Sequence, residues 1–137
     1  MPSEIAVIIP VYNHWQYAMA CVDSLINSTP HARVILIDDC SPELPPPEFV
    51  KSRFENSNGR HIYVRHEKNL QLTAAWNEGF RRAFELDCPY IVATNSDVLF
   101  STGWEVGLLC GSLCGYRLLG PLTNTPGNTK AQLITTM

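Results

Sequence analysis

Short, continuous apolar runs alternate along this chain with longer segments in which apolar residues recur at helical spacing. Residues 5–9 and 34–37 are rich in β-branched side chains, which predicts two strands buried on both faces, and Pro10 is expected to end the first. Residues 61–65 and 90–94 predict a third and a fourth strand.

Helical patterns lie between and after these runs. They predict long helices over residues 15–26 and 70–86, and a short one over 47–56 that starts with a proline. A further helix is predicted over residues 103–114, followed by a short strand at 117–119. Because strand and helix alternate repeatedly, the sequence predicts an α/β fold of three layers, α/β/α, around a mostly parallel, Rossmann-like sheet.

Length and composition limit the class of protein. The 137 residues predict a single domain, with a core over about 1–121 and an irregular tail over 122–137. A formal net charge of -3 gives no basic excess for a phosphate backbone, so no nucleic-acid partner is expected. No apolar run is long enough for a membrane span, and the N-terminus does not resemble a signal peptide. The 5 scattered cysteines are typical of free thiols in a reducing compartment, so a cytoplasmic protein is expected.

Polar and aromatic residues follow each predicted strand. In parallel α/β sheets, ligands bind at the carboxyl ends of the strands, so these segments form the candidate site. They are residues 10–13, 38–41, 67–69 and 95–97.

Three features of these segments suggest chemistry. Asn95 and Asp97 offer oxygen ligands on the same side of an extended strand end, which suits Mg²⁺ or Mn²⁺ with diphosphate oxygens completing the shell. Asp38 and Asp39 have two interpretations. They form either a carboxylate pair that binds a cation or hydrogen-bond donors, or a pair of turn residues that accept hydrogen bonds from backbone N–H groups. Tyr12 is either a platform for a nucleobase or an aromatic residue at the edge of the core.

Several common sites have no support in the sequence. The phosphate-binding patterns GxGxxG and GxxxxGK[ST] are absent, and no serine lies in a GxSxG context. The 4 histidines show no metal-ligand spacing, and His66 is expected to be a solvated loop residue. Cys110 and Cys114 lack the further ligands that a zinc site needs.

The order of these motifs resembles the nucleotide-binding half of family 2 glycosyltransferases, which have the GT-A fold. Each piece is common alone, but the order and spacing are specific to that family. The matching segments are residues 7–13, 34–43, 69–79, 93–97 and 120–124.

The resemblance implies a nucleotide site. Pro10, Val11 and Tyr12 would flank the base. Asp39 would accept the ring N–H of uracil, and Asp38 would support the loop beside it. The other residues of this implied site are Asn13, Asn69, Asn77, Asn95 and Ser96.

The resemblance also implies a divalent metal, Mn²⁺ or Mg²⁺. Asp97 matches the last residue of the family's DxD motif, which is the metal ligand, and Asn95 replaces its first aspartate.

The sequence departs from the family pattern at two further positions. Trp76 occupies a position that is often arginine, so a phosphate contact is expected to be lost, and Leu70 replaces a frequent glycine.

The implied function is transfer of a sugar from a nucleoside-diphosphate donor, a UDP-sugar, to an unknown hydroxyl acceptor with inversion. The catalytic base remains unknown, because Glu105, the only acidic residue after Asp97, is expected on a solvated helix face. Family members continue into an acceptor-binding half that this chain is expected to lack. Two alternatives are therefore open. One is a nucleotide-sugar-binding module that is inactive alone or needs a partner chain, and the other is a structural domain.

The C-terminal part carries more apolar side chains than one short helix and strand can bury, which predicts a homodimer through this region. The partner could also supply the missing base. The apolar residues concerned are Leu108, Leu109, Leu113, Tyr116, Leu118 and Leu119.

Overall fold

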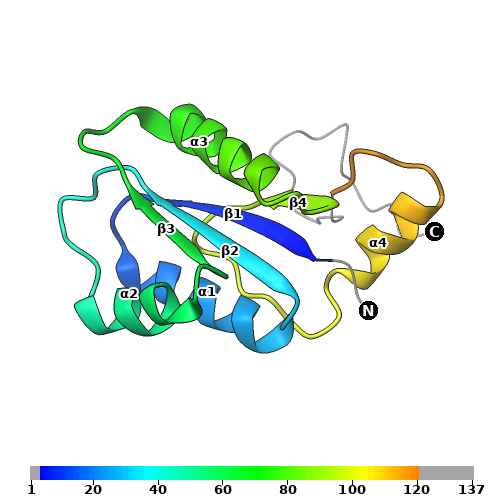
Figure 1. The fold of residues 1–137 in the computed structure, drawn as a ribbon, viewed down its shortest axis with the longest axis horizontal. Coiled ribbons are helices and arrows are strands. Elements are labelled where there is room, and N and C mark those ends of the chain that lie inside the picture. Colours follow the sequence, from blue (N-terminus) through cyan, green and yellow to red (C-terminus); the bar gives the residue numbers. More distant parts are fainter. Residues whose placement is uncertain (1–3, 121–137) are drawn as a thin grey trace, which may run out of the picture. The chain divides into compact units, whose positions relative to one another are not determined.

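Four parallel strands form one sheet in the order β3-β2-β1-β4 (Figure 1). In this computed structural model, which describes residues 4–120, β1 (Ile5–Val11) pairs with β2 (Ala32–Asp38) on one side and with β4 (Tyr90–Ala93) on the other. β3 (Ile62–Arg65) pairs with β2 at the edge. The predicted parallel sheet is therefore confirmed.

The two inner strands carry most of the core. Every residue of β1 is buried, and so is every residue of β2 except Arg33. β3 and β4 are only half-buried because each has a neighbour on one side. The continuous apolar runs that predicted buried strands thus belong to the centre of the sheet.

Pro10 does not end the first strand, as the sequence had suggested. β1 continues to Val11, and Pro10 stands opposite Ile37 of β2. The backbone oxygen of Ile8 accepts a hydrogen bond from Thr94 N, so the backbone polar groups of Ile8 face the β4 side. In a strand the backbone groups of every second residue face the same neighbour, so the Pro10 nitrogen also faces this side, at a level beyond the last residue of β4. No ladder bond is lost there, which is why proline is tolerated in this central strand.

Helices cover both faces of the sheet. Figure 1 shows α3 (Gln71–Glu85) on one face, and α1 (Trp15–Ser28) with α2 (Pro47–Arg53) on the other. The predicted short helix is divided, because a 3₁₀ turn, η1 (Glu55–Ser57), follows α2. α3 lies close to the sheet, since a Cβ at Gly79 would overlap the side chain of Ile8. These layers confirm the predicted α/β/α arrangement.

The structure divides into two compact units between Thr102 and Gly103. In the second unit, α4 (Val106–Leu113) is shorter than predicted, and Glu105 is a half-buried N-cap residue instead of lying on a solvated helix face. Residues 117 and 118 form a bend, and none of residues 117–119 belongs to a strand. They follow Gly115, whose φ of 93° turns the chain, and no strand pairs with them in the part that the structure describes. The predicted tail, 122–137, lies outside the described residues.

No helix described here has both the length and the apolar character that crossing a bilayer requires, a finding restricted to residues 4–120.

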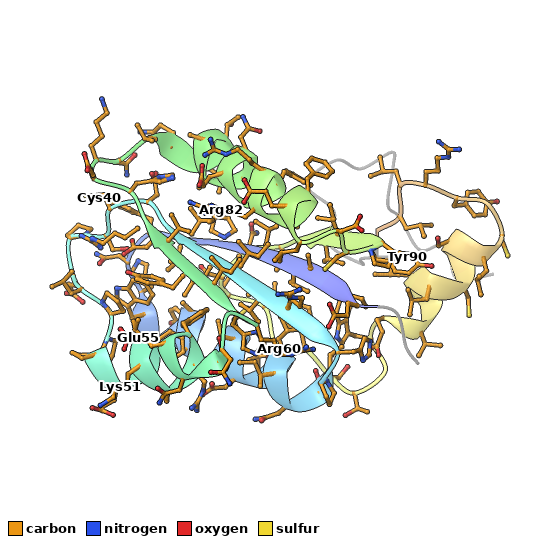
Figure 2. The ribbon with its side chains drawn as sticks, in the orientation of Figure 1. Cys40, Lys51, Glu55, Arg60, Arg82 and Tyr90 are labelled. Atoms are coloured by element: carbon orange, nitrogen blue, oxygen red, sulfur yellow. The ribbon has the colours of Figure 1, made fainter. Side chains whose placement is uncertain are left out.

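The connections create a switch point in the sheet. From β1 the chain moves outward to β2 and β3, and then returns to the other side of β1 to form β4. A crevice is expected beyond the carboxyl ends of the strands where the direction of winding changes. Figure 2 labels Cys40 at this carboxyl edge and Tyr90 at the opposite edge. The switch point therefore directs attention to the residues after β1 and β4.

Candidate functional site

A cleft of about 690 Å³ opens at the switch point. It is formed by the end of β1, the first turn of α1, the loop after β4 and one residue of α3. We call it the Asp97 compartment. Its lining residues are Pro10, Tyr12, Asn13, His14, Tyr17, Leu72, Asn95, Ser96 and Asp97.

A second hollow of about 400 Å³ adjoins it, and we call it the Asp39 compartment. It shares Pro10, Tyr12 and Leu72 with the first, so the two are parts of one groove. Its lining residues are Pro10, Val11, Tyr12, Asp39, Asn69, Gln71, Leu72 and Ala75. Most of the residues predicted from four separate segments thus lie in one continuous groove.

Asp39 is held from one side only. Its side chain is almost fully buried, and Oδ1 lies 2.7 Å from Nδ1 of His66 and accepts a 2.8 Å hydrogen bond from the backbone N–H of Leu70. An ionised carboxylate only accepts, so the imidazole donates from Nδ1 in this pair. Oδ2 takes part in neither bond. One oxygen thus anchors the side chain, and the second can accept a hydrogen bond from a ligand.

Asp38 faces away from the groove and is fully buried. Its carboxylate accepts hydrogen bonds from Ser41 N at 2.8 Å and from Tyr63 Oη at 2.9 Å, and it forms an ion pair with Arg65. Burial, reinforced by the hydrogen bond to Asp38, raises the pKa of Tyr63 above its ordinary value. Asp38 therefore holds the loop after β2, and neither compartment is lined by it.

Asn13 joins the loops after β1 and β2. Its backbone N–H donates to Ser41 Oγ at 2.8 Å, and its Oδ1 accepts from the backbone N–H of Glu43 at 3.3 Å. Both Asn13 and the following His14 have left-handed backbone conformations, with φ of 60° and 54°. Asparagine tolerates that region better than most residues do. Asn13 therefore contributes the shape of the groove as well as part of its lining.

Asn95, Ser96 and Asp97 lie together in the loop after β4 and line the Asp97 compartment. Asp97 is exposed and forms no hydrogen bond or ion pair with any residue that the structure describes. No cluster of three or more His, Cys, Asp or Glu side chains exists among the same residues. A carboxylate and an amide oxygen in an open groove fit Mg²⁺ or Mn²⁺ if outside oxygens complete the shell.

Cys21 lies beneath this loop, with Sγ 3.8 Å from the backbone oxygen of Asn95. Burial raises the pKa of the Cys21 thiol to about 11, so the sulfur is protonated near neutral pH. Cys21 is fully buried and does not line the Asp97 compartment, so it packs beneath this loop.

Tyr12 lies where the two compartments meet. Its side chain is 51% exposed and lines both compartments, so its ring is accessible from the groove. Asn69 is also exposed in the groove, and its Oδ1 accepts a hydrogen bond from the backbone N–H of Gln71 at 3.0 Å.

Asn77, which was predicted to belong to the nucleotide site, does not line the groove. It lines a hollow on the outer face of α3 beside Phe80 and Phe84, apart from the groove.

Sequence reasoning missed several residues of the groove. His66 is not a solvated loop residue, since its side chain is 10% exposed and contacts Asp39. His14, Tyr17 and Leu72 line the Asp97 compartment without having been singled out. Each lies within four residues of a predicted segment, 10–13 or 67–69, but the sequence does not show which neighbouring side chains turn toward the groove.

The start of α3 contains a left-handed residue. Gln71 has φ of 74°, whereas Leu70 has φ of -110°. In this chain the backbone that favours glycine is therefore that of Gln71. A left-handed conformation costs a non-glycine residue roughly 1–2 kcal/mol.

Comparison with known proteins identifies a family. Residues 6–109 match the profile of Glycosyl transferase family 2. Glycosyltransferase GlyA of Streptococcus pneumoniae serotype 4 is 31% identical over 96 residues, which make up 69% of this chain and 13% of GlyA. The chain thus corresponds to a small part of that relative.

Solved structures share the fold at low sequence identity. Residues 1–349 of S. aureus TarS, in complex with UDP, have a TM-score of 0.62 and 18% identity, over 78% of this chain and 31% of that TarS chain. The mannosyltransferase PcManGT of Pyrobaculum calidifontis, in complex with GDP-Man and Mn²⁺, has a TM-score of 0.60 and 20% identity, over 73% of this chain and 29% of its own.

The match over residues 6–109, the identity with GlyA and the shared GT-A architecture show that this chain belongs to glycosyl transferase family 2.

Proposed function

We propose that this chain binds a nucleoside-diphosphate sugar, with uridine as the nucleoside, and transfers the sugar to a hydroxyl acceptor. The observation that carries the proposal is the groove, in which the Asp39 and Asp97 compartments share a wall. One compartment offers a carboxylate oxygen beside an exposed aromatic ring, and the other offers oxygen ligands. A nucleobase and a diphosphate need these two environments side by side.

Each end of the donor has a partner in this arrangement. Tyr12 stacks on the base, and Asp39 Oδ2 accepts its ring N–H. Asn95 and Asp97 would hold Mn²⁺ or Mg²⁺, which as a Lewis acid stabilises the negative charge on a departing diphosphate. The complexes of related folds with UDP and with GDP-Man and Mn²⁺ support this assignment.

The reaction proposed is a direct displacement. The acceptor oxygen attacks the anomeric carbon, the bond from that carbon to the diphosphate oxygen breaks, and configuration at the carbon inverts. The acceptor proton passes to a general base. The carboxylates that line the two compartments are Asp39 and Asp97, which this proposal assigns to base recognition and to metal binding.

With both carboxylates assigned, neither is left to serve as the general base. This favours a second candidate, a nucleotide-sugar-binding module that needs a partner chain for transfer. The chain spans 13% of GlyA and 31% of the TarS 1–349 chain. An assay for UDP release, run with and without hydroxyl acceptors, separates the candidates. Release that depends on an acceptor supports transfer, and UDP binding without release supports the module.

The metal assignment is tested by calorimetry with UDP in Mn²⁺ and in EDTA. We expect EDTA to weaken UDP binding at least about tenfold, because no lysine or arginine is among the described residues that line either compartment. Asp97→Ala should bind UDP equally weakly under both conditions. Glu55→Ala, which removes an exposed carboxylate from η1, is the matched control and should behave as the unmodified chain. Equal UDP affinity of the unmodified chain in Mn²⁺ and in EDTA would contradict the assignment.

A further inference from the structure

A further hollow, of about 420 Å³, lies on the side of the sheet that α1 and α2 cover. Its walls come from α1, α2, η1 and the segment that leads into β3, and it shares no residue with the groove. We call it the arginine hollow. Figure 2 labels one of its residues, Arg60, well apart from Cys40 at the carboxyl edge of the sheet. The lining residues are Asp23, Ile26, Asn27, Ser52, Arg53, Ser57, Arg60 and His61.

Positive charge exceeds negative charge around this hollow. Arg53 pairs with Asp23, with Nε 2.6 Å from Oδ1. Arg60 and Arg33 share a single carboxylate, that of Glu4, at 3.1 and 3.5 Å. Three guanidinium groups thus share two carboxylates. Since Asp23 is the only acidic residue among the described residues that line the hollow, one positive charge of this cluster has no counter-charge.

His61 adds an uncharged donor to the same hollow. Its Nδ1 accepts the backbone N–H of Val34 at 3.1 Å, so the neutral ring carries its proton on Nε2. Burial lowers the pKa of His61, and the charges of Arg60 and Arg33 lower it further. The ring is therefore neutral near pH 7, and the two arginines make the electrostatic potential around it positive.

The two guanidinium groups of the hollow keep donors for a ligand. An arginine side chain has five N–H donors. In Arg60, hydrogen bonds to a carboxylate and to a backbone oxygen use two of them. In Arg53, hydrogen bonds to Asp23 and to Ser52 Oγ use three. The amide of Asn27 is exposed and forms no hydrogen bond with any residue between 4 and 120. Donors on α1, on α2 and before β3 thus line one positively charged hollow.

We propose that the arginine hollow binds a phosphate group, either as the free ion or as a phosphate monoester of a small metabolite. The several oxygens of a phosphate accept charge-assisted hydrogen bonds from guanidinium groups and further ones from the imidazole and amide N–H groups. Donors on three walls suit a tetrahedral group with several acceptor oxygens better than a single spherical ion. The site lies outside the groove and does not depend on the proposed function.

The test is calorimetry of the full chain with inorganic phosphate and with glycerol 3-phosphate at pH 7.5, in EDTA and at an ionic strength fixed with sodium chloride. We expect saturable binding, and the tighter of the two probes identifies the source of the phosphate group. Asp97→Ala should leave both affinities unchanged, because Asp97 lines the groove and not the hollow. Absence of saturable binding of both probes, or its loss in Asp97→Ala, would overturn the proposal.

Two arginine variants then locate the phosphate. Arg60→Gln removes the excess charge and should lower the phosphate affinity about three- to tenfold. Arg53→Gln also leaves Asp23 as an unpaired carboxylate in the hollow, so it should lower the affinity more than about tenfold. Arg82→Gln in α3 is the matched control, since Arg82 is 40% exposed and paired with Glu78, while Arg53 is 41% exposed and paired with Asp23.

Melting temperatures without phosphate verify that each variant is folded. If the variants at Arg53 and Arg60 bind phosphate as tightly as the Arg82 variant, the arginine hollow is not the site. UDP binding in Mn²⁺ is measured in parallel and should be the same in all three variants. A loss of phosphate binding with UDP binding kept supports the hollow as a separate site, and a failure of UDP binding in the unmodified chain would contradict the proposed function alone.

Discussion

Asp38 and Asp39 are adjacent in the chain and have different tasks. Asp38 is the last residue of β2, and its side chain lies between Tyr63 and Arg65 of the neighbouring strand. Successive side chains of an extended segment point to opposite sides, so Asp39 faces the other way, toward the groove. One carboxylate is fully paired within the protein, and the other keeps an oxygen for a ligand.

At this same scale, His66 should act as a positioning residue for Asp39. His66→Ala removes the donor to Oδ1, so the carboxylate is held by one hydrogen bond instead of two, and UDP affinity should fall about three- to tenfold. His66→Asn should restore affinity, because its amide N–H can occupy the place of the Nδ1–H. Calorimetry with UDP and CDP checks this prediction. Equal UDP affinities of the alanine and asparagine variants would contradict it.

Among the elements, the close packing of α3 on β1 depends on one glycine. A Cβ at Gly79 would overlap the Ile8 side chain, which is fully buried and has no free space to enter. Gly79→Ala should therefore lower the free energy of unfolding by about 1–3 kcal/mol despite the better helix propensity of alanine. Thermal unfolding measures the effect. Gly107→Ala in α4 is the control, since no atom lies within 4 Å of its new Cβ, and a loss of similar size there would refute the packing argument.

The junction of β2 and β3 should make stability depend on pH. Nδ1 of His61 accepts the backbone N–H of Val34 at 3.1 Å, and burial lowers the pKa of His61 below its ordinary value of 6.5, with Arg60 and Arg33 adding to the effect. Below pH 6.5 the unfolded chain takes up a proton that the folded chain resists, so the free energy of unfolding falls as the pH falls.

His61→Asn isolates this contribution from the other histidines, since its side-chain oxygen can still accept from Val34. Melting temperatures at pH 7.5 and 5.5 should differ less in this variant than in the unmodified chain. An identical pH dependence in both proteins would rule out His61 as the source.

For the whole molecule, the predicted self-association remains a prediction, and exposed apolar side chains in the second unit support it. Leu113 is 83% exposed and Leu118 is 95% exposed. Light scattering at micromolar concentration should give a mass near twice 15.3 kDa. Leu113→Lys combined with Leu118→Lys should return the chain to 15.3 kDa, while Leu44→Lys, at a 72% exposed leucine of the first unit, should not. A mass of 15.3 kDa for the unmodified chain, with or without UDP and Mn²⁺, would sink the idea.

The sequence by itself determined which segments become strands and helices in the first unit. Burial on both faces demands an unbroken apolar run, as in β1 and β2, and a helix on a sheet demands apolar residues at helical spacing, as in α3. These are local requirements. Since parallel strands end at one edge, the same patterns also predicted that Tyr12, Asp39 and Asp97 lie close together, and all three line the groove.

The tertiary structure alone decided which of these residues contact one another and which line the groove. The return of the chain to the far side of β1 places Asp97 beside Tyr12, and local patterns carry no information about strand order. His66 and Leu70 reach Asp39 across 27 and 31 residues, and those contacts fix the turn at Gln71. The 117–119 segment has an apolar pattern too, but a strand needs a partner, and pairing is a property of the folded chain.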